Sequence, residues 1–195
     1  MKILQNKIPK ESISLISQWI SELNIKLKFV NKRATKLGDF RYDPKNGCII
    51  TVNNNLNQYS SLITLTHEIA HAFVFSKYGK NVKPHGKEWK SIFKKLMINF
   101  LLPNIFPNDV LSSLSLYMIN PSASTSNNLN LVMSLRKYDA EVKPTVGQIG
   151  FGKKFFYSNK VFIKEAALRK RIKCLEIDRK KFYLFNPLTE IKIIE

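Results

Sequence analysis

Hydrophobic positions in the first two thirds of the chain recur mainly with the period of a helix. Residues 9–24 begin with Pro9, a favourable first-turn residue, and place Ile13, Ile16 and Ile20 on one face. A longer apolar segment and several shorter ones follow the same period. The predicted helices cover 9–24, 60–78, a segment that starts near Lys87, 103–120 after Pro107, and 129–138.

Shorter runs of alternating or β-branched residues predict strands. Three of them lie at 25–30, 36–42 and 48–52, with a turn at 43–47, and together they predict a small antiparallel sheet. From about Val146 the pattern changes to short aromatic and β-branched runs separated by turn residues, which predicts four or five strands.

These elements place the chain in the α+β class, with helices over a small antiparallel sheet and a small C-terminal all-β domain. The stretch 120–130, NPSASTSNNLN, is the best candidate for a linker because it is rich in turn residues. We expect a first domain at 1–120, a linker with a short helix at 121–145, and a basic β-rich domain at 146–195.

The 195 residues carry a net charge of +18, and the excess is uneven. Residues 1–100 contribute +11, residues 101–150 contribute zero and residues 151–195 contribute +7. A field of this sign predicts a polyanionic partner, with DNA or RNA bound through the basic surface as the first candidate. The alternative is codon bias, since an AT-rich genome also favours the lysine excess of 26 Lys over 6 Arg.

Other features of the composition exclude several classes of protein. No apolar run approaches the roughly 18 residues that a membrane helix needs, so we expect no membrane span. The first ten residues lack an apolar stretch of the length of a secretory signal. Two cysteines, Cys48 and Cys174, do not suffice for a disulfide framework or a four-cysteine zinc ribbon. We therefore expect a cytoplasmic protein, which would be nucleoid-associated if the charge serves DNA binding.

The candidate chemistry lies in the chain's three histidines. His67 and His71 belong to an HExxH pattern, His67-Glu68-Ile69-Ala70-His71, and residues four apart on a helix project from the same face. Both imidazoles can therefore bind one ion, with Glu68 about 100° round the helix and able to reach a water on that ion.

Two further patterns support a specific role for this helix. Thr64, His67, Glu68 and His71 share one narrow arc, whereas most other positions are apolar, as in a buried helix with one polar stripe. Glu68 is also the only charged residue in the 31 residues between Lys45 and Lys77. An isolated carboxylate in apolar surroundings is costly unless it is paired, hydrogen-bonded or next to a metal.

The third histidine, His85, lies 14 residues past His71, between Pro84 and Gly86. Three neutral imidazoles and one water make the open tetrahedral site of zinc hydrolases, in which a carboxylate accepts a proton from the activated water. Glu88 is an alternative third ligand, as in zincins that complete the site with a glutamate. The metzincin pattern is excluded because Val74 and Lys77 occupy the positions of its Gly and His.

The segment 63–89 resembles the SprT-like metalloproteases of the bacterial SprT and eukaryotic Spartan type. That family pairs HExxH with a His-Gly step followed by Glu and an aromatic residue, which here is His85-Gly86-Lys87-Glu88-Trp89. The preceding segments at 38–42 and 48–53 also resemble the family, and the resemblance covers roughly residues 20–100.

The resemblance implies one Zn²⁺ bound by His67, His71 and His85, with Glu68 as the catalytic residue. It implies a zincin-like minimal metalloprotease core and hydrolysis of peptide bonds in protein substrates near DNA, as in DNA–protein crosslink proteases. One departure is that the C-terminal region lacks the cysteines of the family's zinc ribbon, so we expect a degenerate, ribbon-like domain held by aromatic residues. The competing hypothesis is a non-catalytic, nucleic-acid-associated protein with a structural zinc.

Overall fold

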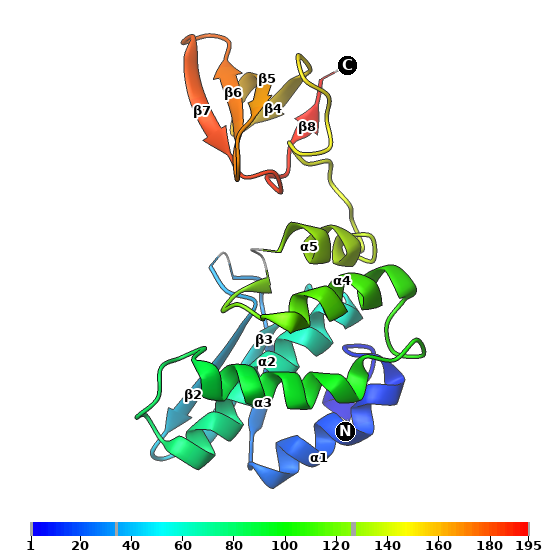
Figure 1. The fold of residues 1–195 in the computed structure, drawn as a ribbon, viewed down its shortest axis with the longest axis vertical. Coiled ribbons are helices and arrows are strands. Elements are labelled where there is room, and N and C mark those ends of the chain that lie inside the picture. The colour runs from blue at the N-terminus through cyan, green and yellow to red at the C-terminus, as the bar shows by residue number, and fades with distance from the viewer. Residues whose placement is uncertain (1, 34, 126–127, 195) are drawn as a thin grey trace. The chain divides into compact units, whose positions relative to one another are not determined.

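The computed structural model describes residues 2–33, 35–125 and 128–194, and its elements are labelled in Figure 1. The chain forms two compact units, residues 1–140 and 141–195. The boundary between them falls inside the segment 121–145 that we expected to be a linker, and most of that segment belongs to the first unit. The predicted α+β class is confirmed. No helix among the described residues combines the length and the hydropathy that crossing a bilayer requires.

The helices of the first unit agree closely with the sequence pattern. The N-terminal helix is shorter than predicted because a 3₁₀ turn at Lys10–Ser12 precedes it. The helices described in this unit are α1 (Ile13–Glu22), α2 (Gln58–Tyr78), α3 (Lys87–Met97), α4 (Asn108–Ile119) and α5 (Leu129–Arg136).

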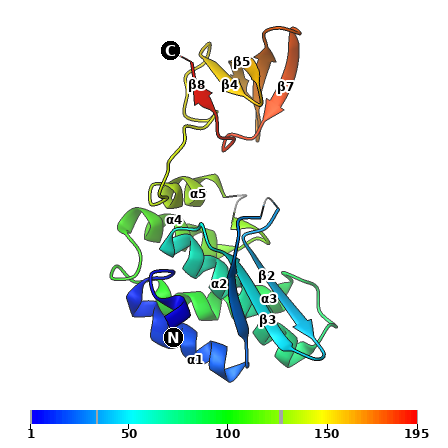
Figure 2. The same cartoon turned by 180° about the vertical axis from the view of Figure 1, so that it is seen from behind.

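The long helix α2 forms the centre of the first unit. It begins at Asn57, whose side-chain oxygen accepts hydrogen bonds from the backbone N–H groups of Tyr59 and Ser60, and it ends at Gly79, which has a left-handed φ of 63°. Its apolar residues are buried around most of its circumference. It contacts the sheet on one side and α3 on the other, so Figures 1 and 2 show α2 and α3 layered over one face of the sheet.

The sheet of the first unit has the strand order β1 (Lys26–Val30), β3 (Gly47–Asn53), β2 (Gly38–Asp43). Strands β2 and β3 form the predicted antiparallel hairpin, but β1 runs parallel to β3, so the sheet is mixed rather than antiparallel throughout. The direction of β1 was wrong in our prediction because residue alternation defines the two faces of a strand and not its direction. The apolar strand β3 takes the central position, and β2 is left at an edge.

The second unit is a five-stranded antiparallel sheet with the order β7-β6-β5-β4-β8. One face is packed with buried aromatic rings, including Phe155, Phe162 and Phe185, whose centroids lie 5.0–5.6 Å apart. Val146, Ile149 and Ile191 complete this core. The strands are β4 (Lys154–Tyr157), β5 (Lys160–Ala167), β6 (Ile172–Glu176), β7 (Lys181–Phe185) and β8 (Lys192–Ile193).

Candidate metal centre

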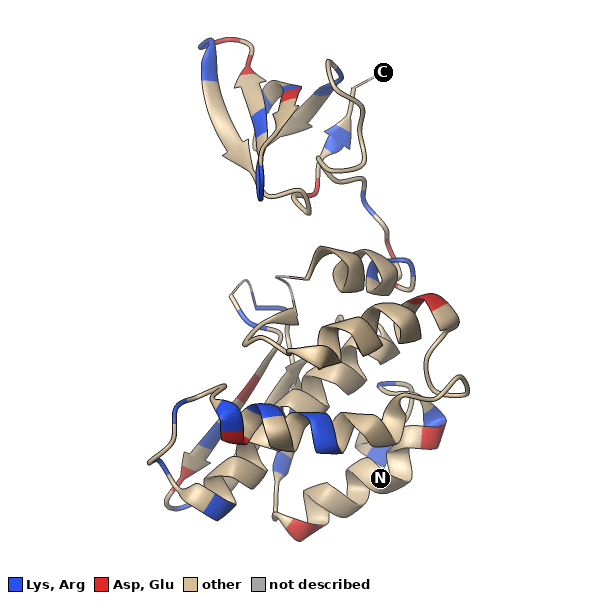
Figure 3. Cartoon of the chain, viewed as in Figure 1, with Lys and Arg blue, Asp and Glu red and all other residues tan. Residues whose placement is uncertain are grey.

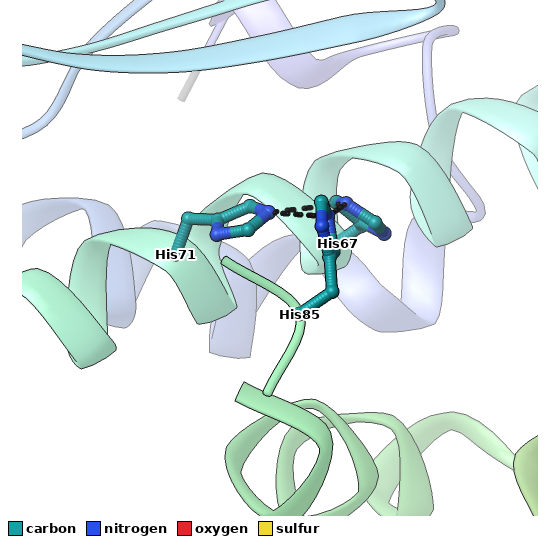
Figure 4. Close-up of side chains that lie close together, drawn as sticks. All are labelled: His67, His71 and His85. Atoms are coloured by element: carbon teal, nitrogen blue, oxygen red, sulfur yellow. Dashed lines mark hydrogen bonds between the residues drawn. The ribbon is translucent and has the colours of Figure 1, made fainter. Parts of the chain in front are cut away.

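The three histidines converge on one point. His67 and His71 project from the same face of α2, and His85 comes from the turn before α3 (Figure 4). The Nε2 atoms lie 3.0 Å apart for His67 and His85, 3.2 Å for His67 and His71, and 2.9 Å for His71 and His85. Three ligand nitrogens at this spacing could hold one metal ion.

The spacing of these nitrogens fits a zinc ion. In a tetrahedral site with Zn–N distances of about 2.0–2.1 Å, neighbouring ligand nitrogens lie about 3.3 Å apart. The observed 2.9–3.2 Å is within a few tenths of an ångström of that value. The three residues form the one group of at least three His, Cys, Asp or Glu side chains in residues 2–33, 35–125 and 128–194 that could hold a metal.

Burial also favours the protonation state that a metal requires. Burial, together with the charges of the neighbouring imidazoles, lowers the pKa of His67 to about 3 and that of His71 to about 4. Burial lowers the pKa of His85 as well. The imidazoles are therefore neutral at physiological pH, with nitrogen lone pairs available for a cation.

The turn that presents His85 has an unusual backbone. His85 has a φ of 58°, a left-handed conformation that residues other than glycine rarely adopt. The turn is closed by a hydrogen bond of 2.9 Å from the Gly86 N–H to the Lys83 carbonyl, after which α3 begins. Such strain at a residue of the site is typical of functional positions. The alternative ligand Glu88 is not part of the metal-holding group, and its carboxylate lies 4.0 Å from the Lys87 ammonium.

The indole of Trp89 supports all three imidazoles from α3. Its ring centroid lies 4.5 Å from that of His67, 5.5 Å from that of His71 and 4.7 Å from that of His85. Trp89 is fully buried, and its indole N–H donates to the His67 carbonyl at 3.4 Å. The sequence identifies Trp89 only as the aromatic residue of the His-Gly motif, because a sequence pattern does not reveal which side chains a buried ring contacts.

Glu68 is buried beside the triad, with 8% of its surface exposed. Burial and, to a smaller extent, the charge of Asp39 raise its pKa to about 8, against the opposing effect of a hydrogen bond from the backbone N–H of Phe40. Gly38 packs directly on this carboxylate, since a Cβ at that position would lie 2.7 Å from Glu68 Oε1. Glycine is therefore required here by close packing, a role that the sequence pattern does not show.

A cleft of about 230 Å³ opens beside His67 and Glu68. One wall is the 35–38 segment that leads into β2, a second is α2, and the third is the 123–125 segment. Residues 121–125, which we expected to begin a linker, pack into the first unit, where the Tyr117 hydroxyl donates to the Ser122 carbonyl at 2.7 Å. Residues 126 and 127 of the expected linker lie outside the described residues.

Comparison with protein-family models gives one match. The model of the SprT-like family matches residues 10–109, a region that contains the three histidines and Glu68. The 123–125 wall of the cleft and the whole second unit lie outside the matched region. Searches of curated proteins and of solved structures found no match.

Proposed function

The chain belongs to the SprT-like family, and from that premise we propose that it is a zinc-dependent metalloendopeptidase acting on protein substrates. The observation that carries the proposal is the convergence of three neutral imidazoles next to a buried carboxylate at a cleft. His67, His71 and His85 would hold one Zn²⁺. The ion supplies Lewis-acid chemistry, which polarises a peptide carbonyl and makes water nucleophilic near neutral pH.

Glu68 is the residue that moves the proton. Its carboxylate accepts a proton from the attacking water and returns it to the nitrogen of the leaving amine. In the metal-free chain burial raises the pKa of this carboxyl, which makes the group a stronger base than a solvated glutamate. A cation held by the histidines would favour the ionised carboxylate, which is the form that accepts the proton. The backbone N–H of Phe40, in β2, donates a hydrogen bond to this carboxylate and so helps to orient it.

The edge strand β2 is suited to orient an extended peptide. It pairs with β3 on one side only, and its first residue, Gly38, lies against Glu68. An extended substrate segment that adds to this edge through backbone hydrogen bonds would pass over the carboxylate. Side chains of such a peptide would enter the cleft between the 35–38 and 123–125 segments.

The competing hypothesis is a structural zinc in a non-catalytic protein. Structural zinc sites are almost always closed by four protein ligands, whereas the described residues offer three ligand side chains here. The three-ligand set and the adjacent carboxylate both favour the catalytic hypothesis.

Cleavage of casein by the zinc-loaded protein, with and without DNA and with a chelator control, tests the proposal. We expect Glu68→Gln to bind zinc as the wild type does and to lose about 10²–10⁴-fold in kcat. Glu88→Gln is the matched control, since Glu88 lies close by on α3 but outside the metal-holding group, and we expect it to keep its activity. Hydrolysis that survives Glu68→Gln would exclude Glu68 as the base.

A further inference from the structure

The edge strand β2 has two faces of different character. Its charged residues alternate with uncharged ones, as Figure 3 shows along the strand. Since strand residues two apart share a face, the charged residues lie on one face and Gly38, Phe40 and Tyr42 on the other. Phe40 pairs with the fully buried Ile50 of β3, and Gly38 contacts the Glu68 side chain. The uncharged face of β2 is therefore the one that faces α2.

Two stacked rings lie at the end of this uncharged face. The ring centroids of Tyr42 and Phe75 are 4.6 Å apart, and their planes are inclined by 29°. Tyr42 is 46% exposed and Phe75 is half-buried, with Phe40 supporting it at 5.9 Å. We call Tyr42 and Phe75 the aromatic platform. Such a pair leaves apolar surface in water that another apolar side chain can cover.

The aromatic platform continues the row of metal-holding side chains along α2. Phe75 follows His71 by four residues, just as His71 follows His67, so the three side chains succeed one another along one side of the helix. The cleft lies at the other end of this row, where His67 lines it. The cleft and the aromatic platform therefore flank the metal centre.

The backbone of β2 is oriented to hold a peptide over the aromatic platform. The Leu37 carbonyl accepts from the Asn53 N–H at 2.9 Å and so points toward β3, whereas the Phe40 N–H donates to Glu68 and so points to the free edge. Because alternate residues of a strand direct their N–H and C=O groups to the same side, Tyr42 presents both groups at the free edge. A peptide residue paired with Tyr42 would place its side chain on the same face, with the two Cβ atoms about 5 Å apart.

We propose that the aromatic platform is a subsite for an aromatic or large aliphatic side chain of the substrate peptide. The inference rests on the proposed peptidase function and adds a sequence preference to it. Glu68 lies against Gly38 and Phe40, so the bond that is cleaved lies opposite these residues. The peptide residue opposite Tyr42 is then about two to four positions from that bond. An apolar side chain is favoured over a charged one, because the charged residues of β2 lie on its other face. A substrate is favoured over other occupants because the platform continues the edge along which the peptide would run.

Peptide binding by the zinc-loaded full chain with Glu68→Gln tests the aromatic platform separately from hydrolysis. Fluorescence anisotropy compares two labelled polar peptides of about ten residues that differ in one central residue, Phe or Ala. We expect the Phe peptide to bind about tenfold more tightly, because its ring covers the platform. Adding Tyr42→Ser or Phe75→Ala should remove this preference, and Tyr42→Trp should keep it. Tyr157→Ser is the matched control and should also keep it, since Tyr157 is 41% exposed and lies in β4 of the second unit.

The cleavage sites in casein give a second readout in the chain with Glu68 intact. Mass spectrometry of the fragments should show aromatic or large aliphatic residues enriched at one position, about two to four residues from the cleaved bond, and Tyr42→Ser should lose this enrichment.

The proposal is overturned if the two peptides bind alike, if Tyr42→Ser keeps the preference, or if Tyr157→Ser loses it. Self-association of the wild type that Tyr42→Ser abolishes would also overturn it, because a second copy of the chain would then cover the platform. Failure of the wild type to hydrolyse casein contradicts the proposed function, whereas the binding comparison decides on the platform in either case.

Discussion

The stability of the metal-free chain depends on pH in two opposite ways, one through His67 and His71 and the other through Glu68. Burial lowers the pKa values of His67 and His71, so the unfolded chain binds more protons than the folded chain below about pH 6.5, and stability falls as the pH falls. Burial raises the pKa of Glu68 to about 8, so the folded chain retains a proton that the unfolded chain releases. Stability therefore also falls as the pH rises above about 4.5.

The variant Glu68→Gln separates the two effects because it leaves the histidines in place. At pH 8 the metal-free variant should be more stable than the wild type by about 4 kcal/mol, and the difference should vanish near pH 4.5. Gln also keeps an oxygen that can accept from the Phe40 N–H. Urea unfolding at a series of pH values measures the difference. A stability gain that is independent of pH would contradict the raised pKa of Glu68.

At the scale of elements, the sequence predicted which segments form helices and strands but not all of their roles. The apolar period of α2 and the i, i+4 spacing of His67 and His71 define a buried helix with two imidazoles on one face. The position of His85 does not follow from spacing alone, because a turn of left-handed backbone returns it to the site, and the His-Gly motif favoured it over Glu88. Small polar residues at 121–125 resemble a linker, yet they pack against Tyr117 and form a wall of the cleft.

That wall leads to a prediction for Ala123. Replacing it with Trp should fill part of the 230 Å³ cleft, so cleavage of casein should fall at least tenfold while zinc affinity stays unchanged, because no ligand is touched. Leu116→Trp, at a 65% exposed position of α4, is the control for a large aromatic substitution nearby in sequence. Full activity in the Ala123 variant, measured as kcat/KM, would show that substrate does not enter the cleft.

At the scale of the whole molecule, the two compact units use different means of stabilisation. The first is built around the apolar helix α2, and the second around stacked phenylalanine rings and a buried ammonium. The Nζ atom of Lys164, in a side chain that is 5% exposed, donates to the carbonyls of Gly147 at 3.2 Å and Ile149 at 2.6 Å. These two hydrogen bonds hold the 147–151 loop in place next to β5. From the lack of zinc-ribbon cysteines we expected a domain held by aromatic residues, and the core of the second unit contains such residues.

Lys164→Met should therefore destabilise the second unit by about 1–3 kcal/mol, since the carbonyls of Gly147 and Ile149 lose a charged donor. Hydrogen exchange should show faster opening of amides in β5 and β6, with α2 unchanged because it belongs to the other unit. Lys153→Met, at an exposed position, is the control and should leave the exchange rates unaltered. Equal acceleration in α2 would contradict the division into two units.

The most direct measurement is competitive zinc titration of the wild type, His85→Ala and Glu88→Ala. We expect one zinc ion per wild-type chain and at least 100-fold weaker binding by His85→Ala, because two imidazoles hold zinc far less tightly than three. Glu88→Ala should bind like the wild type, since its carboxylate is not in the metal-holding group. Unchanged affinity in His85→Ala, with loss of zinc in Glu88→Ala, would contradict a centre built from the three histidines.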